Sequence, residues 1–206
     1  MNKFVIAALA AALPLCAGTI NFDDQNTAGG AVALTNQYAG SGVLFNDITA
    51  AQNFKFNIIP PSALNYASPF WTDLNPGTIS FVSPLNSAVN AYVTSVSFTL
   101  VGLTATVQNP GNFSGATVDA IDLSGNVIAG QTVVIPATAV TGPNQVLSFT
   151  GNVHALRFTH TAATTGALPI DDLTFSQINV PEPSTFGLLA AGLLLVTIAA
   201  SRGRIL

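Results

Sequence analysis

The sequence predicts an all-β protein, a single β-sandwich of jelly-roll type, and three observations lead to this prediction. Its segments are short, alternate apolar with polar residues and are rich in Val, Ile, Thr and Phe. Gly, Pro, Asn and Asp separate these segments, as turn residues do. No helical periodicity of useful length occurs over residues 19–179. Many short strands with frequent turns are typical of sandwiches, and no repeat or linker divides this stretch.

Nine segments of residues 19–179 fit β-strands. They are 19–22, 43–45, 78–82, 92–101, 115–121, 127–135, 145–150, 155–160 and 171–176. The fourth alternates most clearly, and one set of its side chains is expected to face the core: Tyr92, Thr94, Val96, Phe98 and Leu100. Hairpin turns are expected at 122–126 and at Gly151-Asn152.

Residues 1–18 have the layout of a secretory signal peptide. Lys3 supplies the positive charge, residues 4–13 are apolar, and small residues follow Pro14. Cleavage is expected after Ala17 or Gly18, and a buried N-terminal helix is the competing interpretation. The cut would remove Cys16, the only cysteine, so the mature domain has no disulfide, thiolate metal site or cysteine nucleophile.

The remaining stretch, 19–179, is about 160 residues long and suits one domain. Lys55 and Arg157 are its only cations, against eight aspartates, which gives a net charge of −6. So acidic a domain is not expected to bind nucleic acid, because neutralising phosphates requires cations.

Residues 180–206 form a tail of three parts. A polar box contains Pro181, Glu182 and Pro183, an uncharged apolar run occupies 186–200, and arginines follow at 202 and 204. A helix over 186–200 would be roughly 22 Å long, short of a hydrocarbon core of roughly 30 Å, so a buried helix competes on length alone. The absence of charge, and arginines able to reach headgroups on the cytoplasmic side, favour a transmembrane helix.

The box, the apolar run and the terminal arginines together resemble the PEP-CTERM sorting signal of Gram-negative bacteria. The two arginines are separated by Gly203 instead of forming a tight cluster. The resemblance implies processing by exosortase, a membrane-embedded enzyme of species that make exopolysaccharide. It also implies an exported protein that is anchored in the inner membrane first and then reaches the cell surface or the medium.

Three stretches of the domain resemble the globular part of many PEP-CTERM proteins. They are INFDD at 20–24, YAGSGVLF at 38–45 and IDDLTF at 170–175. This second resemblance implies a fold more than an activity.

Two aspartate pairs form the first candidate site, for a metal ion. Asp23 and Asp24 follow the first strand, and Asp171 and Asp172 begin the last. Asp24 continues the phase of the two core residues before it, and Asp171 that of the two after it. Because the first and last strands of a jelly roll can lie side by side, the pairs are expected to meet at the mouth of the core. Clustered carboxylates suit calcium; alternatively, each carboxylate caps a turn or accepts backbone N–H groups.

The loop 65–73 is the second candidate site, for sugar. Tyr66, Phe70 and Trp71 stand there among polar residues and could stack on sugar faces. The competing interpretation is that Phe70 and Trp71 close the end of the sandwich, since large aromatic side chains are usually buried.

Catalysis finds little support, and an enzyme is not expected. His154 and His160 are the only histidines, and six residues along one strand is too far for one metal ion without a fold-back. The only glutamate, Glu182, lies in the polar box, so a two-carboxylate glycosidase would need aspartates alone. The sequence has neither a Gly-x-Ser-x-Gly elbow nor a phosphate-binding glycine loop.

These observations predict an exported surface or extracellular-matrix protein that interacts with polysaccharide. A purely structural matrix protein or adhesin without a defined ligand is the alternative, and a polysaccharide-active enzyme is the third interpretation.

Overall fold

The computed structural model describes residues 17–28, 30–52, 61–62, 65–69, 75–102, 113–161 and 167–181. This part of the chain is all-β, with two short 3-10 helices, η1 (Ala39–Ser41) and η2 (Ala137–Thr141). The strands are β1 (Gly18–Ile20), β2 (Val32–Leu34), β3 (Val43–Asn46), β4 (Ile48–Gln52), β5 (Asn65–Pro69), β6 (Gly77–Ser83), β7 (Asn86–Asn90), β8 (Val93–Leu100), β9 (Gly115–Ile121), β10 (Val127–Pro136), β11 (Gln145–Val153), β12 (Ala155–His160) and β13 (Ile170–Phe175).

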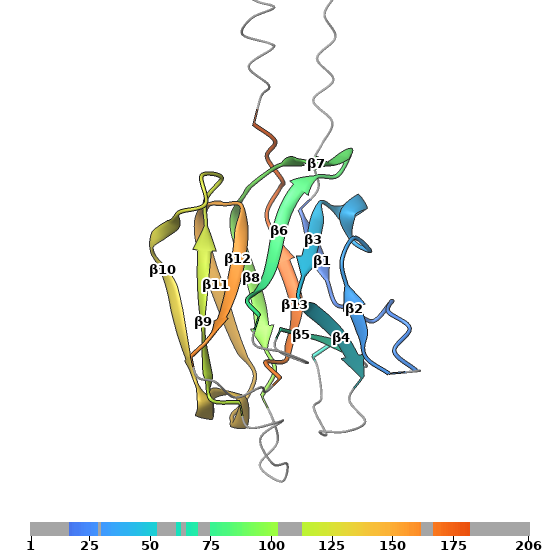
Figure 1. Ribbon diagram of the computed structural model, residues 1–206, viewed down its shortest axis with the longest axis vertical. Coiled ribbons are helices and arrows are strands. Elements are labelled where there is room, and N and C mark those ends of the chain that lie inside the picture. The colour runs from blue at the N-terminus through green and yellow to red at the C-terminus, as the bar shows by residue number, and fades with distance from the viewer. Residues whose placement is uncertain are drawn as a thin grey trace, which may run out of the picture.

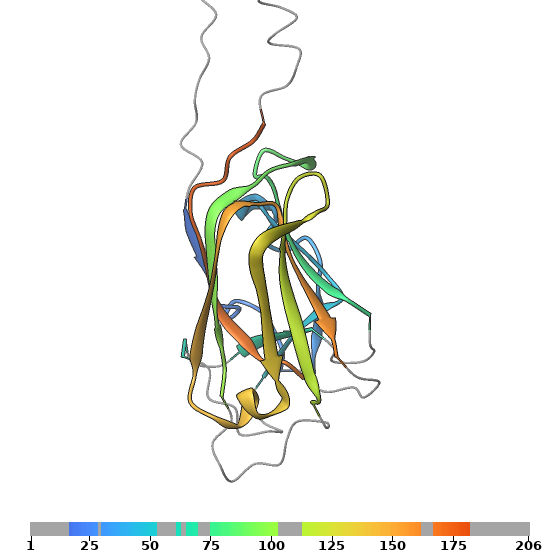
Figure 2. The same cartoon turned by 90° about the vertical axis from the view of Figure 1, so that its left-hand side faces the viewer.

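The strands form two antiparallel sheets that pack as a sandwich (Figures 1 and 2). The first sheet has the order β11-β8-β13-β5-β4-β2, with β1 also paired to β13. The second has the order β10-β9-β12-β6-β3, with β7 paired to β6. Rings from the two sheets meet between them: Phe98 and Phe158 have centroids 5.6 Å apart, and Phe81 and Phe175 5.5 Å apart. The predicted all-β sandwich is confirmed.

One apolar core joins the two sheets. Six of its phenylalanines are almost completely buried: Phe22, Phe81, Phe98, Phe113, Phe149 and Phe158. Burial of each such side chain contributes about 1.5–3 kcal/mol relative to its exposure to water. With no disulfide predicted for the mature domain, this core is the main source of its stability.

Each of the nine predicted strands corresponds to an observed one, but four others were not predicted. The four are β2, β4, β5 and β7. All side chains of β7 are exposed and all those of β5 are buried, so neither strand has the alternation that indicates a half-buried strand. β2 has only three residues, too few for a pattern.

The predicted core face of β8 is confirmed for Val96, Phe98 and Leu100 and wrong at the start of the strand. There Val93 is buried and Thr94 is exposed. The alternation is interrupted within β8, where Thr94 and Ser95 are both exposed. At the same level the neighbouring strand β11 has a bulge, because it pairs Thr150 with Ser95 but Val153 with Val93.

That bulge also corrects one predicted turn. Gly151 and Asn152 do not form a hairpin turn. Both lie opposite Thr94 alone, so β11 has one extra residue there, and Gly151 adopts a φ of 112°. The chain then crosses to the other sheet at His154. The turn at 122–126 is confirmed, because Asp122 Oδ1 accepts hydrogen bonds from the amides of Ser124 (2.8 Å) and Asn126 (2.9 Å). These bonds, that from Asn126 above all, lower the pKa of Asp122.

Both ends of the described chain lie at the same end of the sandwich. β1 runs antiparallel to β13, with Gly18 opposite Phe175, so the first strand begins where the last one ends (Figures 1 and 2). Beyond β13, Asn179 forms a two-bond bridge with Tyr92, with N···O distances of 2.9 and 2.7 Å. Residues 1–16 and 182–206 are therefore joined to the domain at one end.

Among the described residues, no helix is long and apolar enough to cross a membrane. The predicted transmembrane helix at 186–200 and residues 1–16 of the predicted signal peptide lie outside them.

Candidate functional site

The three stretches that carry the family resemblance come together in the fold. Phe22, Tyr38 and Phe45 pack edge to face, with ring centroids 5.7–6.0 Å apart. The first and third stretches pair through β1 and β13, with Ile20 opposite Leu173. These residues lie at the centre of the packing, so the resemblance has a structural explanation.

Asp24 was expected to face the core, but its side chain is exposed, so this prediction is wrong. Strand β1 ends at Ile20, and Phe22 adopts a φ of 62°, which turns the chain and breaks the alternation. Asp24 Oδ1 instead accepts hydrogen bonds from the hydroxyl of buried Tyr38 and from Gln25 Nε2 (3.1 Å). Burial, together with the bond to Asp24, raises the pKa of Tyr38. Asp23 Oδ1 accepts the backbone amide of Asn65 at 3.2 Å.

Asp171 faces the core as expected and is completely buried. Its Oδ2 accepts hydrogen bonds from the Ser62 amide (3.1 Å) and hydroxyl (2.8 Å), and its Oδ1 from the Asp172 amide (2.8 Å). Burial raises the pKa of Asp171 to about 6, although these three bonds oppose the rise. Ser62 Oγ also lies 3.3 Å from the Asn21 carbonyl, so Ser62 stands between the Asp171 carboxylate on β13 and the end of β1.

The first and last strands do lie side by side, as expected. Asp171 and Asp23 lie at one corner of the sandwich, where they accept the backbone amides of Ser62 and Asn65. Asp23, Asp24 and Asp171 each accept hydrogen bonds from protein donors there, which is the alternative weighed against calcium. Within the ranges that the structure describes, no three His, Cys, Asp or Glu residues are grouped so as to hold a metal ion. Calcium binding at Asp23, Asp24, Asp171 and Asp172 stays a prediction.

A buried hydrogen-bond cluster around Asn65 at this corner was not predicted. Asn65, which is 2% exposed, donates through Nδ2 to the carbonyls of Phe22 (3.1 Å) and Gln25 (2.9 Å). Its Oδ1 accepts the Thr27 hydroxyl at 2.7 Å. This cluster holds the turn after β1 against strand β5. No local pattern signals it, because the partners lie about 40 residues apart in the sequence.

Tyr66, the first aromatic residue of the candidate sugar loop, is completely buried in β5. Burial raises the pKa of its hydroxyl. The ring therefore has no exposed face on which a sugar could stack. Phe70 and Trp71, the other two members, lie outside the described residues.

The two histidines have separate structural partners. His154 stands where the chain crosses between the sheets, with Nδ1 2.7 Å from the Ala91 carbonyl. His160 packs edge to face with Phe113 at 5.8 Å. Their surroundings account for both residues as parts of the packing.

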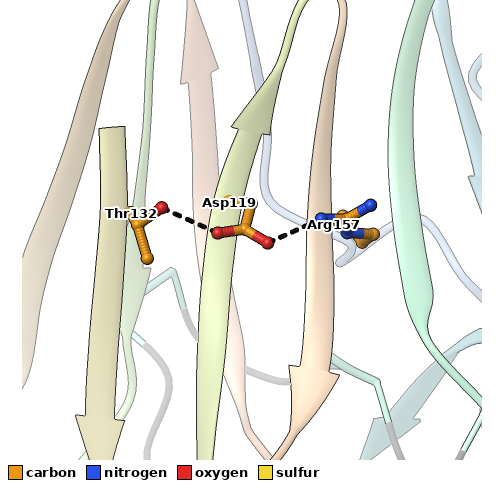
Figure 3. Close-up of polar contacts among 3 residues, drawn as sticks. All are labelled: Asp119, Thr132 and Arg157. Atoms are coloured by element: carbon orange, nitrogen blue, oxygen red, sulfur yellow. Dashed lines mark hydrogen bonds and ion pairs between the residues drawn. The ribbon is translucent and has the colours of Figure 1, made fainter. Parts of the chain in front are cut away.

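A polar row crosses the outer face of the second sheet (Figure 3). Asp119 on β9 lies opposite Thr132 on β10 and Arg157 on β12. Its carboxylate accepts the Thr132 hydroxyl at 2.8 Å and pairs with Arg157 Nη2 at 2.8 Å. Arg157 is the only Lys or Arg in the described part of the chain, and 42% of its side chain is exposed, so the pair contributes about 1 kcal/mol or less.

The predicted polar box begins directly after Asn179, the last paired residue in the part of the chain that the structure describes. Asn179 forms the bridge with Tyr92, and Pro181 is the last residue described. Glu182 and Pro183 lie outside the described residues.

The family profile of the PEP-CTERM protein-sorting motif matches residues 179–204. The chain carries the PEP-CTERM motif. This confirms the resemblance drawn from the box, the apolar run and the arginines. The motif implies a surface protein sorted by exosortase, and its match begins at Asn179, the last bridged residue of the sandwich.

A comparison with solved structures finds several distant matches. The K2 cleaved adhesin domain of Lys-gingipain is 12% identical with a TM-score of 0.45, and the match covers 79% of this chain and 100% of that one. A family 6 carbohydrate-binding module is 12% identical with a TM-score of 0.32, and the match covers 78% of this chain and 93% of that one. The CBM35 of Paenibacillus barcinonensis is 15% identical with a TM-score of 0.32, and the match covers 67% of this chain and 94% of that one. Similarity at this level assigns neither ligand nor activity, and no curated protein matches the sequence.

Proposed function

We propose that this chain is an exported surface or extracellular-matrix protein. Residues 186–200 anchor the precursor in the inner membrane, exosortase processes it beside Pro181, Glu182 and Pro183, and the domain then remains at the surface or is released. The match of the sorting motif to residues 179–204 carries this proposal.

The position of the motif supports processing without damage to the fold. Among the described residues the last backbone pairing is at Asn179, before the box, so a cut within or after the box removes none of the described strands. The five residues from Pro181 to the start of the apolar run can span at most about 18 Å. The anchored precursor would therefore hold the end of the sandwich that contains both chain ends close to the lipid.

We also infer that the sandwich is a jelly roll. Four strands of the first sheet have the order β5-β13-β8-β11, and four of the second have the order β6-β12-β9-β10. Most connections between these eight strands cross from one sheet to the other, as two Greek keys folded into a jelly roll require.

The ligand we propose is polysaccharide. The domain has a net charge of −6 and only two cations, so its polar surface consists mainly of hydroxyl and amide groups, which hydrogen-bond sugars. A purely structural matrix protein or adhesin without a ligand is the alternative, and we propose no enzymatic activity.

Retention on immobilised exopolysaccharide of the producing species separates these two functions. Wild-type chain should be retained, and Trp71→Ala reduces retention if the loop at 65–73 contributes. Leu85→Ala is the control, because Leu85 is an apolar side chain that is 73% exposed at another loop. A wild-type chain that is not retained on any polysaccharide supports the structural alternative.

A further inference from the structure

The outer face of the first sheet carries a hollow that none of the predicted sites includes. Its volume is about 390 Å³, within the range of ligand sites. The backbone of three core residues, Val96, Phe149 and Phe175, forms its floor, and their side chains point into the sandwich. Every other lining residue carries a hydroxyl group: Ser95, Ser97, Ser148, Thr150, Thr174 and Ser176.

Strand pairing arranges these hydroxyl groups in rows. Ser148, Ser97 and Thr174 lie opposite one another on β11, β8 and β13. Thr19 on β1 extends the row, with its hydroxyl 3.1 Å from that of Thr174. Neighbouring strands are about 4.8 Å apart, so the row spans roughly 14 Å across four strands.

A second row lies beside the first and is held by the backbone. Thr150 on β11 is opposite Ser95 on β8. Ser176 Oγ accepts hydrogen bonds from the amides of Thr94 (2.9 Å) and Ser95 (3.1 Å), which fixes this side chain at the edge of the hollow. The two rows present a fixed grid of hydrogen-bonding groups.

We propose that this hollow binds a neutral polysaccharide chain across strands β11, β8 and β13. The assignment rests on the proposed function and names its site and ligand class. Hydroxyl groups both donate and accept, and so match the hydroxyl groups of a sugar chain in either role. None of the lining residues that the structure describes is a cation able to pair with a uronate, sulfate or phosphate group, and the negative charge of the domain repels an acidic polymer.

A protein partner fits this surface poorly. Protein interfaces depend on a few buried aromatic or arginine anchors and the pockets that receive them. None of the described residues that line the hollow is charged, and its two phenylalanines face the core, so they expose no ring.

Affinity electrophoresis of the full-length chain in detergent tests the assignment. The gels contain dextran, a soluble β-glucan or xylan as neutral polymers, or alginate as an acidic one. Wild type should be retarded by at least one neutral polymer and not by alginate. Ser97→Ala with Ser148→Ala should weaken the interaction about tenfold or more, since each lost hydrogen bond changes affinity by about threefold to tenfold.

Two further variants complete the design. Ser80→Ala is the matched control, because Ser80 is a half-buried serine on the outer face of the other sheet. Ser148→Glu places a charge at an exposed position on the edge strand β11, where the fold tolerates it, and should abolish retardation. This variant keeps the test valid if the double variant fails to fold.

Each result supports or overturns the proposal. If a polymer retards wild type and retards both hollow variants equally, the hollow is not the binding site. Polysaccharide binding by the domain is then still supported. Stronger retardation by alginate overturns the neutral ligand. If no polymer retards wild type, the assignment and the polysaccharide part of the proposed function both fail, whereas surface sorting is judged separately by fractionation.

Discussion

At the residue scale, the most informative side chain is Asp171, a carboxylate that is completely buried beside Ser62. Its burial could be predicted, because Leu173 and Phe175 set the phase of the strand and both are buried. The exposure of Asp24 could not, since it depends on the left-handed conformation of Phe22, and a phenylalanine rarely adopts that conformation. The aromatic contacts with Tyr38 and Phe45 that accompany it come from later in the chain.

Asp171 predicts a pH dependence of stability. Its pKa in the fold is about 6, above the ordinary value of 3.8, so between these values the folded chain keeps a proton that the unfolded chain loses. Asp171 therefore makes its full contribution to the free energy of unfolding when the pH is below the ordinary pKa. This contribution is lost as the pH rises to the raised pKa, and the loss is on the order of 2 kcal/mol. Urea unfolding of wild type and Asp171→Asn at pH 4 and pH 7 measures this.

The variant cannot ionise at this position, so it should gain stability relative to wild type on going from pH 4 to pH 7. Asp47→Asn, at an exposed turn, controls for the loss of one carboxylate. An equal pH response of wild type and Asp171→Asn would contradict the raised pKa.

Calcium binding by the two Asp pairs is checked by melting temperature. If the cation binds, millimolar calcium raises the melting temperature of wild type, because a ligand of the folded state stabilises it, and Asp171→Ala abolishes the rise. An unchanged wild-type melting temperature would contradict calcium binding and favour the alternative, in which Asp23, Asp24 and Asp171 only accept the hydrogen bonds from Asn65, Tyr38 and Ser62.

At the element scale, strands were predictable where one face is buried. β9 and β12 were predicted with their observed bounds. β5 was not, because its five residues are all buried and include Pro69, so the sequence has no period of two. The bulge at Gly151 was mistaken for a hairpin turn, since a glycine with positive φ serves both structures.

Strand β1 predicts which of two bonds signal peptidase cuts. Gly18 begins β1 and lies opposite Phe175, whose ring would come within 2.8 Å of a Cβ atom at position 18. A cut after Ala17 preserves the whole strand, whereas a cut after Gly18 removes one of its three residues. Sequencing the N-terminus of the exported protein should give Gly18 first, and a chain that begins at Thr19 would contradict this prediction.

At the scale of the whole molecule, the sequence was sufficient for the fold class and for the sorting motif. Both depend on local patterns: alternation and turn residues for the sandwich, and three consecutive parts for the tail. The hydroxyl-lined hollow was not predictable, because its residues come from β8, β11 and the end of β13 with the residue after it, which only the sheet order brings together. Serines on the outer face of a strand look alike in sequence, whether or not they line a hollow.

The central claim is that the tail after Asn179 sorts the domain through exosortase, and one comparison tests it most directly. Cells expressing wild type, or a variant with Pro181, Glu182 and Pro183 all changed to Ala, are separated into inner-membrane, surface and medium fractions, and the intact mass of the protein is measured in each. Wild type should be found at the surface or in the medium with its C-terminal tail removed, and the variant in the inner membrane with the tail intact. A variant that reaches the surface in the same amount and with the same mass as wild type would contradict the claim.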